Sequence, residues 1–303
     1  MPGTGRRAAS YAIIEPYSVL EARWNILRNI GSEAIRQAVR DACVEACCRL
    51  PEDVLSALRA ARDTEQGPGR AVLEQLLENA ALAGERMRPC CQDTGMAVVF
   101  VDLGQDVHIE GNLTEAVNAG VAAGYGEGYL RKSVVSALSR KNTGDNTPAI
   151  LHLRLVEGDG LTIAVAPKGF GSENMSRLHM LTPAEGEAGI LHAIVETVRQ
   201  AGACACPPCV VGVGIGGTME AAALLAKRQL LRPLGRPSAD PALARIEREA
   251  LAQINASGIG PMGLGGVTTA LAVHAAEMPT HIAGLPVAVN MQCHACRHAE
   301  RRL

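Results

Sequence analysis

Apolar residues at helical spacing dominate the first part of the chain after residue 31. From Ser32 they recur every three or four positions as far as Leu50, which predicts an amphipathic helix. Pro51 suits the first turn of a helix, so a second helix is predicted through Leu58. The Gly-Pro-Gly sequence that follows should break the chain before a third helix begins.

Short apolar runs between turn residues mark the predicted strands. Ala97–Val101 is a continuous apolar run typical of a buried strand, and Cys209–Val213 and Leu285–Met291 are predicted to be strands too. Ala149–Val156 and Leu161–Ala166 flank a Glu-Gly-Asp-Gly turn. That arrangement predicts that these two strands pair as a hairpin.

Further helices are predicted among these strands. They run from Asn112 or Thr114 towards Arg131, from Thr182 through Val198, from Thr218 to Leu231 and from Ala242 to Ile254. The first two have capping signals, an Asn or Thr and a Thr-Pro-Ala-Glu capping box. Helices alternating with scattered strands predict a mixed α/β fold, with β-sheets flanked by helices. We assign residues 1–31 to an N-terminal extension that is partly disordered, and residues 32–303 to one domain.

Composition narrows the classes of function. The 303 residues carry a formal net charge of −2 and no basic run, which argues against nucleic acid as the main partner. Charged residues, Gly or Pro interrupt every apolar run, so no membrane span is expected. The N-terminus lacks the apolar segment of a secretory signal. Ten cysteines without such a signal predict reduced thiols in a cytoplasmic protein.

Three cysteine-bearing loops are the candidate chemical centre. They are Arg88–Gly95, Ala203–Cys209 and Gln292–Cys296, which lie far apart in the sequence. The C-x-x-C spacing in the second and third loops would suit a Cys₄ zinc site. That site would leave the first loop without a role, and Pro207 and Pro208 lack the N–H groups that a zinc knuckle donates to sulfur.

One cysteine from each loop fits better with an iron–sulfur cluster. Three thiolates would hold three of its four irons, and the fourth iron could bind a substrate as a Lewis acid. Any single cysteine is nonetheless more commonly buried and inert. We accept that simpler interpretation for Cys43, Cys47 and Cys48, which share one predicted helix.

A glycine-rich sequence offers a rival function. Gly212–Gly217 fits the pattern G-x-G-x-x-G between a predicted strand and a predicted helix, as in dinucleotide-binding proteins. A second strand ending in an acidic residue should then follow that helix, and instead the chain enters a proline-rich link. We therefore reject nicotinamide binding. The helix N-terminus could still favour an anionic cluster or a carboxylate, or the glycines could simply permit close backbone packing at a tight turn.

Six motifs in order resemble the alpha part of class I, iron–sulfur fumarases. They are Cys91–Gly95, Tyr129–Arg131, Lys168–Met175, Cys206–Pro208 with the glycines of 211–217, Gly258–Gly266, and Gln292–Ala295. The resemblance extends from about Ser32 to the end of the chain. The alpha subunit of L-tartrate dehydratase shares the cysteine loops but departs from the Lys168–Met175 pattern, so malate and fumarate are the favoured substrates.

The resemblance implies which residues form the site. Cys91, Cys206 and Cys293 would be the ligands of a [4Fe-4S] cluster with one iron not held by protein. The substrate would contact Gln92, Asp93, Arg131 and a backbone amide near Gly171, while Asp93 and Arg131 would also serve catalysis. The chain departs from the family pattern by the extra cysteines Cys90, Cys204, Cys209 and Cys296 and by Phe170 within the glycine run.

Several roles stay open from the residues themselves. Arg131 suits a dicarboxylate because a guanidinium binds a carboxylate with two hydrogen bonds, although it could be a solvated helix-end residue. Asp93 could belong to the base that removes the C3 proton, or it could only orient its loop. Lys168 is a weaker candidate for the substrate site, and His294 and His298 could orient the cluster or a substrate water, or could be polar residues with satisfied hydrogen bonds.

The resemblance also implies a partner. The remaining acid–base groups would lie in a beta subunit, so this chain would be half of a hydro-lyase, assembled as a dimer of alpha–beta units. An iron–sulfur electron carrier and a structural zinc protein are the alternatives of another class. A carrier would hold its cluster by four thiolates and would not respond to malate.

Overall fold

The computed structural model describes residues 27–303. Most of the predicted N-terminal extension, residues 1–26, lies outside this range. Its last four residues, Arg28–Gly31, form strand β1, which pairs in parallel with β3 (Val107–Glu110). Regular structure therefore begins four residues before the predicted start of the domain.

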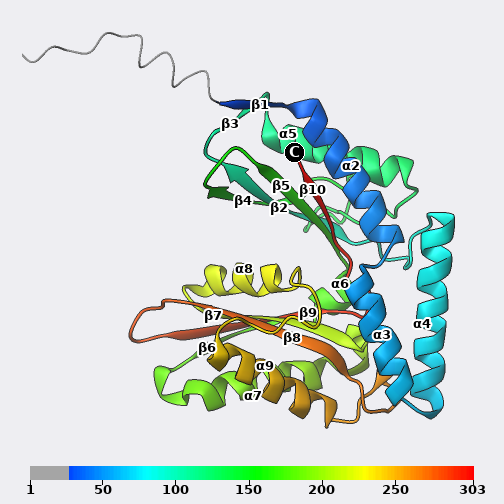
Figure 1. Cartoon of the computed structure of the whole chain (residues 1–303), viewed down its shortest axis with the longest axis vertical. Coiled ribbons are helices and arrows are strands. Elements are labelled where there is room, and N and C mark those ends of the chain that lie inside the picture. Colours follow the sequence, from blue (N-terminus) through cyan, green and yellow to red (C-terminus); the bar gives the residue numbers. More distant parts are fainter. Residues whose placement is uncertain (1–26) are drawn as a thin grey trace, which may run out of the picture.

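Two four-stranded sheets and their helices build the molecule, which confirms the mixed α/β fold (Figure 1). The first sheet has the strand order β10 (Ala299–Arg302), β5 (Leu161–Lys168), β2 (Met96–Gly104), β4 (Ile150–Val156). The second has the order β6 (Arg177–Leu181), β9 (Leu285–Gln292), β7 (Cys209–Gly216), β8 (Ala270–Met278).

Each sheet buries an apolar core beneath two helices. Helices α2 (Ser32–Cys48) and α5 (Leu113–Glu127) cover the first sheet, and α7 (Gly186–Ala201) and α9 (Pro241–Asn255) cover the second. Helix α8 (Met219–Gln229) lies between the sheets (Figure 1).

Contacts made by α8 and by two further helices join the two sheets. Arg228 of α8 forms an ion pair with Asp102 of β2 at 2.7 Å. Helices α3 (Glu52–Thr64) and α4 (Gly67–Arg86) pack along one side of the molecule, over a third apolar cluster.

The predicted hairpin is wrong. Strands β4 and β5 both form, but β2 lies between them, parallel to β4 and antiparallel to β5. The turn at residues 157–160 instead wraps around the end of β2, since Gly104 N donates to Gly160 O at 2.8 Å. A Cβ atom at Gly104 would lie 2.2 Å from Gly158 O, so only glycine fits there.

Most predicted helices form, with shifted ends. Helix α5 begins at its Asn112 cap as predicted but ends at Glu127, so Arg131 lies in a loop. The Gly-Pro-Gly sequence is the first turn of α4 rather than a break, because proline is tolerated there. The Thr182 capping box forms, although it caps a 3₁₀ turn (Pro183–Glu185) before α7. The short helix α6 (Phe170–Glu173) and strands β6 and β10 were not predicted.

The glycines of 212–217 serve packing, which is one of the two roles left open for them. A Cβ atom at Gly212 or Gly214 would lie 2.2 Å from a carbonyl oxygen of α8, so these glycines let the helix approach β7 closely. Helix α8 leads to α9 and not to a strand, which agrees with rejecting a dinucleotide fold. No helix between residues 27 and 303 has the length and apolarity of a membrane span.

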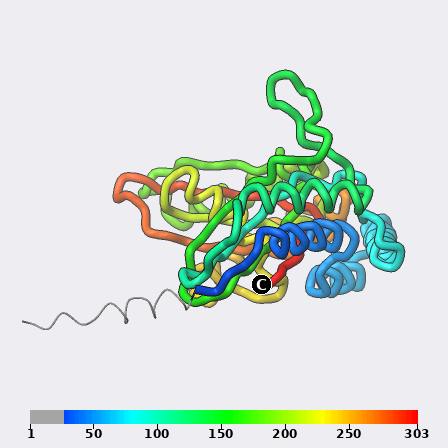
Figure 2. Tube along the Cα trace, turned by 90° about the horizontal axis from the view of Figure 1, so that it is seen from above, coloured from blue at the N-terminus to red at the C-terminus, as the bar shows by residue number. Residues whose placement is uncertain are grey.

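The segment between α5 and β4 projects from the body of the molecule, as the green loop in Figure 2. An antiparallel bridge between Val135 and Asn142 closes this loop. Leu138, at its tip, is 96% exposed.

Candidate active site at the cysteine loops

The sheet topology brings two of the three cysteine loops together. Cys206 lies three residues before β7 and Cys293 immediately follows β9. These strands are antiparallel neighbours with Val210 opposite Gln292, so the two loops meet at one end of the sheet. His294 N donates to Cys206 O at 3.2 Å and joins them directly.

Cys206 occupies a tight and uncommon turn. Its φ of 52° and ψ of 63° lie in the left-handed region, which non-glycine residues seldom adopt. The turn is held by Cys206 N, which donates to Ala203 O at 3.0 Å, and by Met262 N, which donates to Pro207 O at 2.8 Å. Such conformations cluster at functional sites, where the surrounding structure imposes them.

The Cys91 loop is anchored by the carboxylate of Asp93. Its Oδ1 accepts from Gly95 N at 3.0 Å and its Oδ2 accepts from Phe170 N at 2.9 Å. Gly95 has a φ of +75°, and a Cβ atom there would lie 2.6 Å from the backbone of Lys168. Asp93 thus makes the contacts of a loop-orienting residue, while Cys91 and Gln92 remain exposed.

Arg297 ties the first cysteine loop to the third. Its side chain is buried, and its Nε donates to Pro167 O at 3.2 Å. Its Nη1 donates to Cys90 Sγ at 3.9 Å, and its Nη2 donates to Asp93 O. The sequence analysis missed this residue, although its place one position after Cys296 could have drawn attention to it.

Hydrogen bonds join the three loops, since Arg297 contacts the first loop and His294 N donates to Cys206 O between the third and the second. Burial raises the pKa of the Cys206 thiol, and the negative charges of Cys293 and Cys91 raise it further. The charge of Asp93 acts on Cys206 in the same direction. The three loops therefore converge, with Asp93 among them.

Two of the extra cysteines point away from this centre. Cys209 Sγ donates to Ala205 O at 3.7 Å inside the core of the second sheet. Cys296 Sγ donates to Leu230 O at 3.4 Å beneath α3 and α4, where burial raises its pKa to about 12. Because these two thiols lie in different cores, a Cys₄ zinc site from the C-x-x-C pairs does not form. No three His, Cys, Asp or Glu side chains among residues 27–303 are grouped to hold a single ion.

The remaining cysteines divide by burial. Cys43, Cys47 and Cys48 are buried on α2, which confirms the simpler interpretation of them as core residues. Cys90 lies against that helix, since its N–H donates to Cys47 O at 3.0 Å. Cys204 is exposed, and its carbonyl oxygen lies near Gly171, at 3.8 Å from the position of a Cβ atom there.

A cavity of about 570 Å³ opens beside Asp93. The basic side chains in its wall are Arg131, as the sequence predicted, and Arg140, which the sequence analysis missed. Its other walls are mainly apolar or small and include Met96, Val134, Val135, Ala137 and Phe170. Asp93 is the only acidic residue in the wall, among the residues that the structure describes.

Asn146 fastens the Arg131 segment to the Cys91 loop. It is fully buried, its Oδ1 accepts from Ser133 N at 2.7 Å and Val134 N at 3.1 Å, and its Nδ2 donates to Gly95 O at 3.2 Å. Thr94 Oγ1 adds a bond to Arg131 O at 3.0 Å. Cavity wall and cysteine loop therefore form one hydrogen-bonded unit.

Lys168 is an internal residue and not a surface lysine. Its Nζ donates to Met291 O at 2.8 Å and to Ser172 Oγ at 3.1 Å, and forms an ion pair with Glu173 at 3.2 Å. It thereby joins β5, β9 and α6 behind the cysteine loops. Burial lowers its pKa, while the charge of Glu173 opposes that shift.

The two C-terminal histidines are largely buried, and neither Nδ1 atom has a hydrogen-bond partner within residues 27–303. Burial lowers the pKa of His294 to about 4, and the charge of Arg297 lowers it further. His294 is therefore neutral at physiological pH.

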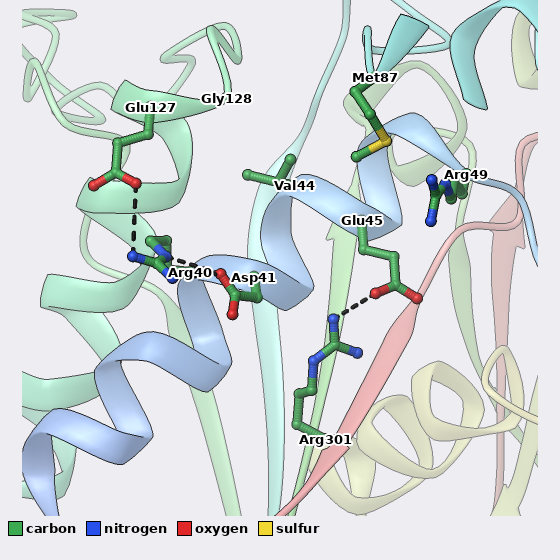
Figure 3. A pocket seen from close by; sticks show the side chains of 9 residues that line it. All are labelled: Arg40, Asp41, Val44, Glu45, Arg49, Met87, Glu127, Gly128 and Arg301. Atoms are coloured by element: carbon green, nitrogen blue, oxygen red, sulfur yellow. Dashed lines mark hydrogen bonds and ion pairs between the residues drawn. The ribbon is translucent and has the colours of Figure 1, made fainter. Parts of the chain in front are cut away.

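A second cavity, of about 610 Å³, lies away from the cysteine loops between α2, the end of α5 and β10 (Figure 3). Its side chains largely pair with one another, as Arg40 does with Glu127 and Arg301 with Glu45. Because it contains no cysteine and its charges are mixed, it is the weaker candidate for a dicarboxylate.

Sequence comparisons find relatives over most of the chain. The family described as Fumarate hydratase (Fumerase) matches residues 36–302. A protein of Methanocaldococcus jannaschii named "Putative L(+)-tartrate dehydratase subunit alpha" is 41% identical over 268 residues, which cover 86% of this chain and 94% of that protein. The L(+)-tartrate dehydratase subunit alpha of Escherichia coli K12 is 32% identical over 254 residues, covering 82% of this chain and 84% of that protein.

Proposed function

This chain belongs to the Fumarate hydratase (Fumerase) family, and from that premise we propose that it is the alpha subunit of an iron–sulfur hydro-lyase that interconverts (S)-malate and fumarate. The family match and the named relatives identify a hydro-lyase of the class I fumarate hydratase alpha or tartrate dehydratase alpha type. The observation that carries the finer proposal is the convergence of three cysteine loops beside a cavity with two arginines.

Cys91, Cys206 and Cys293 would hold a [4Fe-4S] cluster through three of its irons. The donor set fits, because Cys91, Cys206 and Cys293 are all exposed or half-buried, as are Cys90 and Cys204, while Cys209 and Cys296 are turned into cores. A buried guanidinium, Arg297, beside these thiols also suits an anionic group. When bound, the cluster supplies a Lewis-acidic iron for the C2 hydroxyl of the substrate.

Arg131 and Arg140 would bind the substrate carboxylates. A guanidinium offers two parallel N–H donors to a carboxylate, and both arginines line the same cavity. Gln92 adds an amide on the exposed side of the cysteine loop. The N–H of Gly171, in the first turn of α6, has no intrahelical acceptor and is free to donate to a carboxylate.

Asp93 would belong to the system that takes the C3 proton. Each of its oxygens already accepts a backbone N–H, which fixes the carboxylate in the cavity wall. A fixed carboxylate can accept a proton or hold a water that does so. The rest of that system would lie on the companion beta subunit, in a dimer of alpha–beta units in the cytoplasm. The relatives' designation as alpha subunits supports a companion.

L(+)-tartrate is the second candidate substrate, because the named relatives are designated for it. Tartrate carries a hydroxyl at C3, where malate has only hydrogens. The wall carries the apolar Met96, Val134 and Val135 together with the polar Ser133 and Asn174, so its lining does not select between the two acids. The Lys168–Met175 motif, which resembles that of the class I fumarases and differs from that of tartrate dehydratase, is what favours malate.

The test is anaerobic reconstitution of the chain with its companion, followed by assays on both acids. We expect malate turnover, with kcat/KM for malate exceeding that for tartrate. Arg131→Lys should raise KM for malate on the order of tenfold or more, because the bidentate contact is lost. Arg154→Lys, on the exposed face of β4, is the matched control. Faster tartrate than malate turnover would favour the second candidate, and an unchanged KM in Arg131→Lys would remove Arg131 from the site.

A further inference from the structure

We propose that Arg297 is a positioning residue, which holds the Cys91 and Cys293 loops in register and supplies the buried positive charge that accommodates the cluster. The inference rests on the proposed function, and it assigns a role to a residue outside the predicted ligand set.

The hydrogen bonds of Arg297 define its mechanical role. It follows Cys293 by four residues and is 5% exposed. Its guanidinium donates to Asp93 O and Cys90 Sγ in the first loop and to Pro167 O at the end of β5. A single planar group thus contacts the loop on both sides of Cys91, at the Cys90 side chain and at the Asp93 backbone.

Gly169 borders both Arg297 and the Asp93 carboxylate. A Cβ atom there would lie 3.0 Å from Asp93 Oδ2, which is crowded, and 3.6 Å from Arg297 Nη2, which is ordinary van der Waals contact. A side chain at 169 would therefore press first on Asp93, whose backbone oxygen accepts from Arg297.

The charge of Arg297 lacks a carboxylate partner. None of the ion pairs among residues 27–303 includes it. An unpaired buried charge is costly, and thiols bind iron as thiolates. A cluster on Cys91 and Cys293 would therefore supply the negative charge that this guanidinium lacks.

Two consequences follow for the loaded protein. Loss of the guanidinium should loosen the first loop, so that the cluster dissociates faster. Loss of the positive charge should make reduction of the cluster harder, because nearby charge is among the factors that set its reduction potential.

The experiment compares Arg297→Gln and Arg297→Lys with wild type after anaerobic reconstitution. The matched control is Arg301→Gln, which removes an arginine of the same C-terminal segment that pairs with Glu45. Three properties are measured: the rate of iron loss to a chelator, the reduction potential of the cluster, and the unfolding temperature of the cluster-free chain.

We expect Arg297→Gln to lose iron on the order of tenfold faster, as befits a lost charged hydrogen bond, and its potential to become more negative. Arg297→Lys keeps the charge without the planar fork, so it should lose iron faster at a near-wild-type potential. Arg301→Gln should match wild type in both properties.

A loaded Arg297→Gln protein with wild-type iron loss and potential would overturn the inference, even if its cluster-free form unfolded at a lower temperature. That result would show that Arg297 serves only the stability of the fold, and it would leave the proposed function intact. If Arg297→Gln fails to fold, the Arg297→Lys comparison decides by the same criteria. A wild-type chain that takes up no cluster would overturn the proposed function and this inference together.

Discussion

The cysteines differ in what surrounds their sulfur atoms, and this sets what each can do. Cys91, Cys206 and Cys293 are exposed or half-buried where three loops meet, whereas Cys209 and Cys296 donate to carbonyl groups inside two cores. Neighbouring cysteines in one motif are therefore not interchangeable. Burial separates Cys209 from Cys206 and Cys296 from Cys293, but it does not separate Cys90 from Cys91 or Cys204 from Cys206.

Serine substitutions should separate the two groups. Cys293→Ser is expected to abolish retention of iron and sulfide, since an alcohol is a poor ligand for the cluster. Cys296→Ser should retain iron at wild-type stoichiometry but lower the free energy of unfolding by about 1–3 kcal/mol, because a hydroxyl replaces a buried thiol. Iron and sulfide analysis with urea unfolding measures both effects. Loss of iron in Cys296→Ser but not in Cys293→Ser would show that Cys296, and not Cys293, binds the cluster.

His274 should make stability depend on pH. Burial lowers its pKa to about 4, and the charge of Arg232 lowers it further, while an unfolded histidine titrates near 6.5. Above pH 6.5 His274 is neutral in both the folded and the unfolded protein, so its contribution to stability is fully present. As the pH falls towards 4 the unfolded state binds the proton first, and stability falls by about 3 kcal/mol at most.

The measurement is urea unfolding of the cluster-free chain across this pH range. His274→Gln should give a shallower decline than wild type, because one titrating group has been removed. If the free energy of unfolding declined equally with falling pH in wild type and in His274→Gln, His274 would not be held neutral in the folded protein.

At the scale of elements, the approach of α8 to β7 depends on glycine. A Cβ atom at Gly214 would lie 2.2 Å from Ala222 O, so Gly214→Ala should force the helix away and cost about 2 kcal/mol or more. Gly126, in α5, has no heavy atom within 4 Å of a Cβ position. Gly126→Ala should therefore stabilise the protein by about 0.5–1 kcal/mol. Thermal unfolding of both variants checks the contrast, and a tolerated Gly214→Ala would contradict the packing argument.

The projecting loop depends on Asn146 for its register against the cysteine loop. Asn146→Ala removes three hydrogen bonds and leaves Gly95 O, Ser133 N and Val134 N without that partner. We expect a loss of about 2–4 kcal/mol in stability and a higher KM for the substrate, because Arg131 loses its fixed position. Asn142→Ala, in the exposed part of the same loop, is the control. Equal KM values in Asn146→Ala and Asn142→Ala would show that the position of the loop does not affect substrate binding.

At the scale of the whole molecule, local sequence patterns predicted the helices and the continuous apolar strands, but they did not predict which strands pair with one another. The predicted hairpin does not form because β4 and β5 each pair with β2. Nothing in the sequences of β4 and β5 themselves indicates that pairing. Lys168 was only a weaker candidate for the substrate site, because the sequence alone does not show that its acceptors, Met291 O and Ser172 Oγ, belong to β9 and α6. Arg297 was missed for the same reason, since its partners lie about two hundred residues earlier.

The meeting of two predicted ligands follows from the strand order. Cys206 lies three residues before β7 and Cys293 directly follows β9, so the two loops meet once those strands are neighbours. The sequence motifs named Arg131, but Arg140 enters the cavity through the fold of the projecting loop. The cluster, the substrate and the companion subunit remain predictions.

The central claim is best tested by a Mössbauer spectrum of the anaerobic chain reconstituted with ⁵⁷Fe and its companion, recorded with and without malate. The account predicts a four-iron cluster in which one iron site shifts on addition of malate while the other three stay unchanged. A spectrum in which all iron sites are indifferent to malate, or a protein that retains no iron, would contradict it.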